Sequence, residues 1–173
     1  MSTKRHLKKK TVNKNHKKVN LTKKIRKQQL KKTRINKLVG GEVREIEHIW
    51  FKGWPDQGVP QDMEEFNIFI TQIYQDMSNN LGNTVIHCSA GVGRTGVVYV
   101  VLKLLSEGYI AYTYNPFINK NPPDINTDQL KIKIDTIINE ERQNRNEIFV
   151  QEDVQYNFIY QYFAGKEMDY FKS

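Results

Sequence analysis

The residues best suited to do chemistry lie together in one stretch, His87-Cys88-Ser89-Ala90-Gly91-Val92-Gly93-Arg94-Thr95-Gly96. The single cysteine of the chain, Cys88, is followed six positions later by Arg94, with glycines in between. In a tight, glycine-containing loop that opens into a helix, successive peptide N–H groups point inward and bind anions. A guanidinium that closes such a loop donates two hydrogen bonds to phosphate oxygens. The spacing therefore predicts a phosphate cradle around a sulfur atom. We call residues 87–96 the signature loop.

Cys88 is expected to be the nucleophile of this cradle. The loop amides and the helix dipole lower the pKa of a thiol placed among them, and the thiolate is the reactive form. Attack of the sulfur on phosphorus leaves a phosphocysteine, which water hydrolyses. The hydroxyl of Thr95 is suited to help the thiolate depart in that second step. The alternative is an inert thiol at the end of a strand, which the glycines and the arginine at fixed offsets disfavour.

A proton donor for the leaving group is expected from Trp54-Pro55-Asp56-Gln57-Gly58-Val59-Pro60, which we call the acid loop (residues 54–60). Its prolines and glycine mark a loop. A carboxylic acid can protonate the leaving oxygen of a phosphate ester, and Asp56 is the carboxyl group of this loop. Without the signature loop, Asp56 would be read as an ordinary turn residue.

The elements around these loops predict an α/β body with helices packed on a sheet. Residues 43–51 and 84–87 are rich in β-branched, aromatic or apolar residues and are expected to be strands. The apolar residues between 21 and 38 fit a ragged amphipathic helix, or else a strand at about residues 25–33, and the pair Gly40-Gly41 marks the turn that follows.

Four helices are expected from the spacing of apolar residues. They begin or end near turn signals and cover residues 62–77, 97–105, 128–142 and 151–163. In the last of these, Val154, Phe158, Ile159 and Tyr162 are expected to face inward. Loops are expected at 79–83 and 116–123.

The charge of the chain is divided unevenly. The sequence has 173 residues and a net charge of +8, yet residues 1–37 hold 16 of the 27 Lys and Arg and no acidic residue. We expect a disordered basic arm (1–20), a catalytic domain (42–165) and a tail (166–173). For the basic segment between the arm and the domain (21–41) the sequence does not decide the structure, and an edge strand is one of the alternatives. Contact of residues 4–37 with polyanions should be weak and non-specific, because the lysine clusters lack interleaved aromatic residues. A nuclear address, an RNA contact and an anionic-membrane contact are the alternatives to a solvated tail.

Several classes of protein are disfavoured by composition. The longest apolar run, residues 97–105, contains Lys103 and is about half of what a bilayer crossing requires. A single cysteine cannot form an internal disulfide, and the four histidines lack metal-ligand spacing, so no metal or other cofactor is expected. These features predict a cytoplasmic protein, with the nucleus as the alternative.

The signature loop resembles the phosphate-binding loop of the protein tyrosine phosphatases, and the acid loop resembles the mobile acid loop of that family. The resemblance implies an α/β fold with a central mixed β-sheet flanked by helices, phosphotyrosine-containing proteins as substrates, and no cofactor. It implies Asp56 as general acid and then base, Trp54 as loop anchor, and His87 as a residue that tunes the cysteine. It assigns phosphate binding to Ser89, Ala90, Gly91, Val92, Gly93 and Arg94.

A third match lies downstream, where residues 142–145 and 149–156 resemble the paired arginines and the glutamine loop of the family. A glutamine there positions the hydrolytic water, and either Gln151 or Gln155 has that role here; the alternative is that both are solvated residues of a first helical turn. The resemblance runs from about residue 42 to 163 and corresponds to the C-terminal half of the usual catalytic domain. Residues 1–41 lack the tyrosine loop that sets pocket depth in the family.

Three functions follow from these motifs. The favoured one is hydrolysis of phosphotyrosine in proteins through a phosphocysteine. A dual-specificity, phosphoinositide or RNA 5′-phosphatase would use the same cysteine chemistry on other substrates. A pseudophosphatase would bind phosphotyrosine without turnover.

Overall fold

The computed structural model describes residues 30–39, 41–79, 83–112, 125–166 and 168. The chain forms two compact units, Met1–Gly53 and Trp54–Ser173. The expected basic arm, the loop at 116–123 and most of the turn at 79–83 lie outside the described residues. The expected start of a domain at residue 42 falls inside the first unit, because strand pairing joins the residues on both sides of that position.

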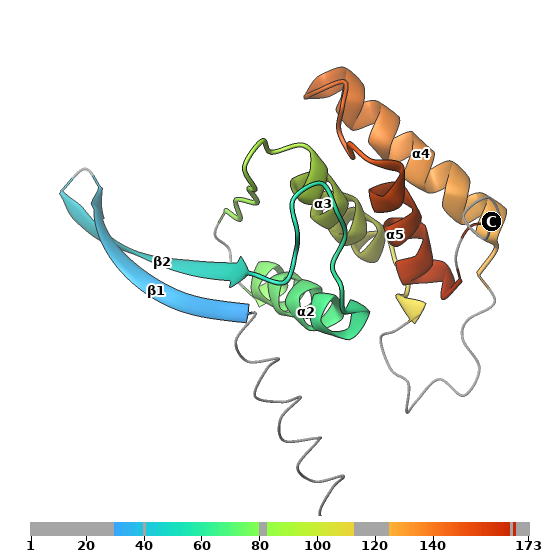
Figure 1. Cartoon of the computed structure of the whole chain (residues 1–173). Coiled ribbons are helices and arrows are strands. Elements are labelled where there is room, and N and C mark those ends of the chain that lie inside the picture. Colours follow the sequence, from blue (N-terminus) through green and yellow to red (C-terminus); the bar gives the residue numbers. More distant parts are fainter. Residues whose placement is uncertain (1–29, 40, 80–82, 113–124, 167, 169–173) are drawn as a thin grey trace, which may run out of the picture. The chain divides into compact units, whose positions relative to one another are not determined.

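The first unit contains a hairpin of two antiparallel strands, β1 (Leu30–Val39) and β2 (Glu42–Phe51) (Figure 1). Their register pairs Leu30 with Phe51 and Val39 with Glu42. In the turn, Gly41 has a φ of +84°, a conformation that glycine adopts without a steric penalty. The strand expected at 43–51 is confirmed, and the choice left open upstream is resolved as a strand from residue 30 onward.

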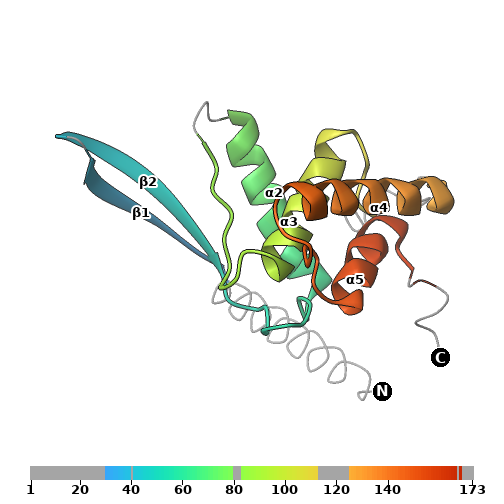
Figure 2. The same ribbon diagram turned by 90° about the horizontal axis from the view of Figure 1, so that it is seen from above.

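The second unit contains four helices, α2 (Met63–Asn79), α3 (Gly93–Ser106), α4 (Thr127–Asn144) and α5 (Asp153–Ala164). Helix α3 contacts the other three and lies between α2 and the pair α4 and α5 (Figures 1 and 2). The core between them is rich in aromatic and branched side chains. Its largest fully buried members include Phe66, Ile70, Leu104, Leu130, Ile134, Phe149, Ile159, Tyr162 and Phe163.

The starts of these helices follow from local side-chain chemistry. The Asp62 carboxylate accepts the amide of Glu64 at 2.8 Å, and the Asn126 side chain caps α4 in the same way. Helix α5 begins with a capping box between Glu152 and Gln155. All four expected helices are therefore confirmed. Helix α3 begins four residues before its apolar run, so its first turn carries the end of the signature loop.

Two expectations about the second unit are wrong. Residues 84–87 have no regular secondary structure and form no strand, because no other described segment pairs with them, and Val85 is 83% exposed. The side chain of Val154 is exposed instead of facing inward, whereas Phe158, Ile159 and Tyr162 are buried as expected. Among the described residues, the expected central sheet is represented by β1 and β2 alone. No helix in the described part of the chain has the length and hydropathy of a membrane span.

Candidate active site

The signature loop curls around its cysteine. Cys88 lies five positions before the first residue of α3, and the amide of Gly91 donates a hydrogen bond to its Sγ at 3.1 Å. Gly91 has a φ of +77°, which a residue with a side chain adopts only with strain. The loop thus brings a backbone donor to the sulfur, as the spacing predicts.

The surroundings of Cys88 favour the thiolate. Burial raises the pKa of the thiol, but the hydroxyl of Thr95, the amides of Thr95 and Gly91 and the charge of Arg94 together outweigh it, and the pKa is lowered from its ordinary value. Thr95 is only 3% exposed, and its Oγ1 makes no hydrogen bond of ordinary geometry to any described residue. The buried hydroxyl of Thr95 is therefore not engaged elsewhere among the described residues, and it contributes to the lowered pKa of Cys88, the group that it is expected to assist.

Arg94 connects the two loops. Its Nη2 donates to Asp56 Oδ1 at 2.5 Å and to Ser89 Oγ at 3.1 Å. The Asp56 side chain is 77% exposed, while that of Arg94 is mostly buried. Residues 38 positions apart in the sequence are thereby held at one point. The expected acid and the expected phosphate clamp lie together.

Trp54 anchors the acid loop to the helical core. Its buried ring packs edge-to-face on Phe66, with a centroid distance of 5.5 Å, and lies against Phe158. Its Nε1 donates to the carbonyl oxygen of Gly58 at 2.8 Å. The loop is therefore fixed at both ends, while Asp56 between these points remains exposed.

The two candidate glutamines both lie beside the first residue of α3. An added Cβ on Gly93 would lie 3.1 Å from both amide atoms of Gln155 and 3.5 Å from Oε1 of Gln151. Gln155 is buried, and its Nε2 also donates to the carbonyl oxygen of Gly58 at 3.3 Å. Gln151 is exposed. The signature loop, the acid loop and the start of α5 thus meet at Gln155.

A support for the signature loop that the sequence analysis missed comes from Val150. Its amide donates to the carbonyl oxygen of Val92 at 3.2 Å, and that oxygen also accepts the amide of Gly96. Val150 has a φ of +55°, which is unfavourable for a β-branched residue. Arg142 holds this turn by donating to the carbonyl oxygens of Phe149 at 3.0 Å and Val150 at 3.2 Å. The paired arginines at residues 142–145 were the one sequence signal that could have indicated this support. Nothing in the residue type of Val150 indicates a left-handed backbone.

The structure gives fewer contacts for the remaining residues that the sequence predicts to belong to the site. His87 is exposed, and no hydrogen bond joins it to Cys88 within the described residues, so its tuning role stays a prediction. Ser89 and Ala90 are exposed, whereas Val92 and Gly93 are buried.

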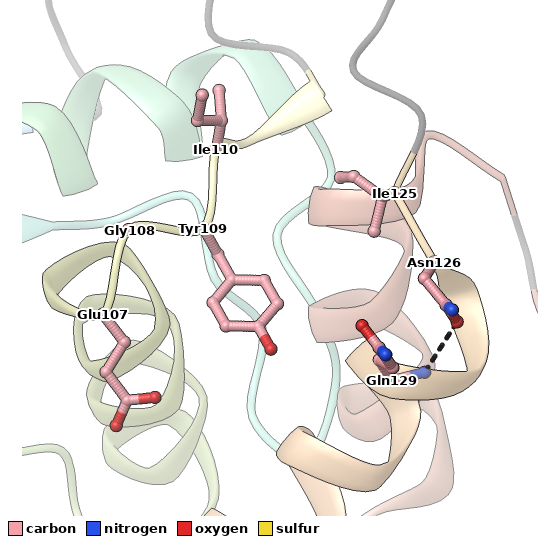
Figure 3. A pocket seen from close by; sticks show the side chains of 7 residues that line it. All are labelled: Glu107, Gly108, Tyr109, Ile110, Ile125, Asn126 and Gln129. Carbon is pink, nitrogen blue, oxygen red and sulfur yellow. Dashed lines mark hydrogen bonds between the residues drawn. The ribbon is translucent and has the colours of Figure 1, made fainter.

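A cavity of about 260 Å³ lies elsewhere, beyond the end of α3, and is lined by side chains such as Tyr109, Ile125 and Gln129 (Figure 3). None of the residues that line this cavity belongs to the signature loop or the acid loop. The candidate site around Cys88 therefore rests on its hydrogen bonds and charges, and not on this cavity.

Comparison with known families agrees with this geometry. A family model described as protein-tyrosine phosphatase matches residues 2–164. The chain belongs to the protein-tyrosine phosphatase family. The match begins well before residue 42, so the family likeness extends further toward the N-terminus than the motifs alone indicate.

Curated relatives in this family are much longer than the chain. It is 46% identical over 66 residues to the tyrosine-protein phosphatase Lar-like of Caenorhabditis elegans, which covers 38% of this chain and 3% of that protein. It is 38% identical over 80 residues to the human receptor-type tyrosine-protein phosphatase F, covering 45% of this chain and 4% of that protein. The chain therefore spans only a small fraction of the length of these protein-tyrosine phosphatases.

Solved structures confirm the fold class. The catalytic domain of human protein tyrosine phosphatase non-receptor type 18 is similar with a TM-score of 0.52 and 24% identity, over 79% of this chain and 42% of that one. A structure of PTPN18 in complex with HER2 phosphopeptides has a TM-score of 0.51 and 23% identity, and covers 79% and 44%. The α/β fold expected from the resemblance is thus that of part of a protein-tyrosine phosphatase catalytic domain.

Proposed function

We propose that this chain hydrolyses phosphotyrosine in proteins through a phosphocysteine intermediate. The observation that carries the proposal is the arrangement of three groups around the signature loop. Cys88 accepts a backbone N–H, and Arg94 is hydrogen-bonded to both Ser89 and Asp56. A nucleophile, an anion clamp and a carboxylic acid in such proximity are what cleavage of a phosphate monoester requires.

The first step transfers the phosphoryl group to sulfur. Arg94 and the loop amides bind the phosphate oxygens and stabilise the charge that develops on them. The electron pair of the Cys88 thiolate forms the S–P bond while the P–O bond to the tyrosine oxygen breaks. Asp56, in its protonated form, gives its proton to that departing oxygen. The products are a free tyrosine side chain and phosphocysteine.

The second step returns the enzyme to its starting state. A water molecule, oriented by Gln151 or Gln155, attacks phosphorus and loses a proton to the Asp56 carboxylate. The S–P bond breaks, its electron pair returns to sulfur, and the hydroxyl of Thr95 stabilises the thiolate. Inorganic phosphate leaves.

A phosphotyrosine-containing protein is the proposed substrate. The structural neighbour bound to HER2 phosphopeptides supports a peptide ligand for this fold. We propose that residues 4–37 add weak, non-specific contact with polyanions, because this segment is strongly basic and contains no acidic residue. A nucleophile that must remain a reduced thiol supports a cytoplasmic location, with the nucleus as the alternative.

The test is phosphate release by the purified chain. A phosphotyrosine peptide, a phosphoserine peptide, a phosphoinositide and a triphosphorylated RNA are compared at equal concentration, with Cys88→Ser as the control. We expect release from the phosphotyrosine peptide that Cys88→Ser abolishes. If phosphate is released only from another of these substrates, the chain is a cysteine-dependent phosphatase for that class of substrate and not for phosphotyrosine. Binding of the phosphotyrosine peptide without turnover would identify a pseudophosphatase.

A further inference from the structure

We propose that Gln155 is a positioning residue that holds the acid loop against the start of α3. This inference rests on the proposed function, because it assigns the acid loop its role in proton donation. It also separates the two glutamines, since Gln151 is then the residue left to orient water.

Both ends of the Gln155 amide are already engaged. Its Nε2 donates to the carbonyl oxygen of Gly58 at 3.3 Å, and its Oε1 accepts the amide of Glu152 at 3.4 Å in the capping box of α5. The Gly58 oxygen receives a second donor, Nε1 of Trp54, at 2.8 Å. One carbonyl of the acid loop is therefore tied both to the aromatic core and to the first turn of α5.

Burial makes these bonds costly to lose. Gln155 is 1% exposed, and a buried amide group that loses its hydrogen-bond partner cannot regain one from water. Its amide also lies flat against Gly93, the first residue of α3, where any Cβ would meet both amide atoms at 3.1 Å. The absence of a side chain at Gly93 thus leaves room for the link between the acid loop and α3.

Gln151 differs in each respect. It is exposed, and neither end of its amide bonds to a described residue, although its Oε1 lies near the same point of α3. A residue that orients a water molecule needs a donor or acceptor that is not already used. Each end of the Gln155 amide already makes a hydrogen bond and the side chain is buried, whereas both ends of the exposed Gln151 amide can bind a water molecule.

Loss of the Gln155 donor should release the acid loop while leaving the thiolate and the arginine clamp in place. Proton donation matters most when the leaving oxygen is strongly basic. The defect should therefore be large for phenyl phosphate, whose leaving group needs the acid, and small for 4-nitrophenyl phosphate, whose leaving group departs readily. A general loss of folding would slow both substrates equally.

The experiment measures the first step, release of the phenol, in stopped flow. Gln155→Met should slow it about 10- to 100-fold with phenyl phosphate and less than about threefold with 4-nitrophenyl phosphate. The matched variant Gln151→Met should leave this step unchanged and slow the later hydrolysis of phosphocysteine.

Gln155→Glu keeps the acceptor for the Glu152 amide, and hence the helix cap, but lacks the donor. It should reproduce the Met variant even if the latter folds poorly. Equal slowing of both substrates, or none, would overturn the proposal.

A readout independent of activity uses tryptophan fluorescence. The chain has two tryptophans, so Trp50→Phe leaves Trp54 as the reporter of the acid loop. In that background, Gln155→Glu should shift the emission of Trp54 to longer wavelength, and Gln151→Met should not. If the wild-type chain releases no phosphate, the proposed function fails, and the emission shift still decides whether Gln155 holds the loop. An unchanged spectrum would contradict the positioning role.

Discussion

The Asp56 carboxylate accepts a 2.5 Å hydrogen bond from Arg94, the residue expected to bind phosphate. The same Nη2 of Arg94 also donates to Ser89. A phosphate dianion at this guanidinium would place its negative charge next to the carboxylate. Ionised Asp56 and the substrate therefore compete for Arg94, whereas protonated Asp56 does not. The protonated form, which the proposed mechanism requires as the acid, is thus also the form that would admit the phosphate.

Replacing Asp56 should accordingly separate turnover from binding. We expect Asp56→Asn to lower kcat by about 10²–10⁴ with a phosphotyrosine peptide, because the leaving phenolate loses its proton donor. Inhibition by inorganic phosphate should be as strong as in the wild type or stronger, because a competing negative charge has been removed. Steady-state kinetics with phosphate as inhibitor measures both quantities. An unchanged kcat would remove Asp56 from the mechanism.

The reactivity of Cys88 should follow the lowered pKa of its thiol. Folding lowers this pKa, so the folded state favours the thiolate. The resulting contribution to stability is fully present above the ordinary pKa of a thiol, and it is lost as the pH falls through the lower folded value. The pH dependence of alkylation by iodoacetamide should therefore have a lower midpoint in the folded chain than in the urea-unfolded chain. Coinciding midpoints would contradict it.

Thr95→Val should raise the midpoint of that same titration. The Thr95 hydroxyl is the largest of the influences that lower the pKa of Cys88, and valine has nearly the same shape without the oxygen. The control is Thr95→Ser, which keeps the hydroxyl and should retain a midpoint closer to that of the wild type. Equal midpoints for the valine and serine variants would show that the hydroxyl does not act on the sulfur.

Arg142, in the last turn of α4, and Arg145, the residue that follows this helix, offer a matched pair. Arg142 donates to the backbone carbonyl oxygens of two buried residues, whereas the half-exposed Arg145 makes a long ion pair with Glu141 at 3.8 Å and lies over the rings of Tyr99 and Phe149. A lysine cannot reproduce the two-donor geometry, so Arg142→Lys should lower the free energy of unfolding by about 1–3 kcal/mol. Arg145→Lys should change it by less than about 1 kcal/mol. Urea unfolding of both variants checks the difference, and similar losses would contradict the assigned role of Arg142.

The parts of the site that the sequence predicts are those with local causes. Cys88, Gly91 and Arg94 lie within seven consecutive residues, so their spacing alone brings them together. The strand expected at 84–87 depends on a partner strand from elsewhere, which local composition cannot supply. The apolar period places Val154 inward, but the capping box of α5 directs Gln155 inward instead. The contact between Val150 and the signature loop depends equally on tertiary packing.

The same contact makes Gly96 sensitive to a single methyl group. An added Cβ would lie 2.9 Å from the amide nitrogen of Val150, so either α3 or the turn held by Arg142 must shift. We expect Gly96→Ala to lower the free energy of unfolding by about 1–3 kcal/mol, a typical cost of overpacking.

Gly108→Ala is the control for Gly96→Ala, because no atom lies within 4 Å of its added Cβ and its cost comes from a φ of +90° alone. Both variants should melt at lower temperature than the wild type. Well below melting, only Gly96→Ala should slow the alkylation of Cys88, because Val150 and Gly96 share the Val92 carbonyl oxygen that supports the signature loop. Wild-type alkylation rates in Gly96→Ala would mean that this carbonyl does not govern the position of the sulfur.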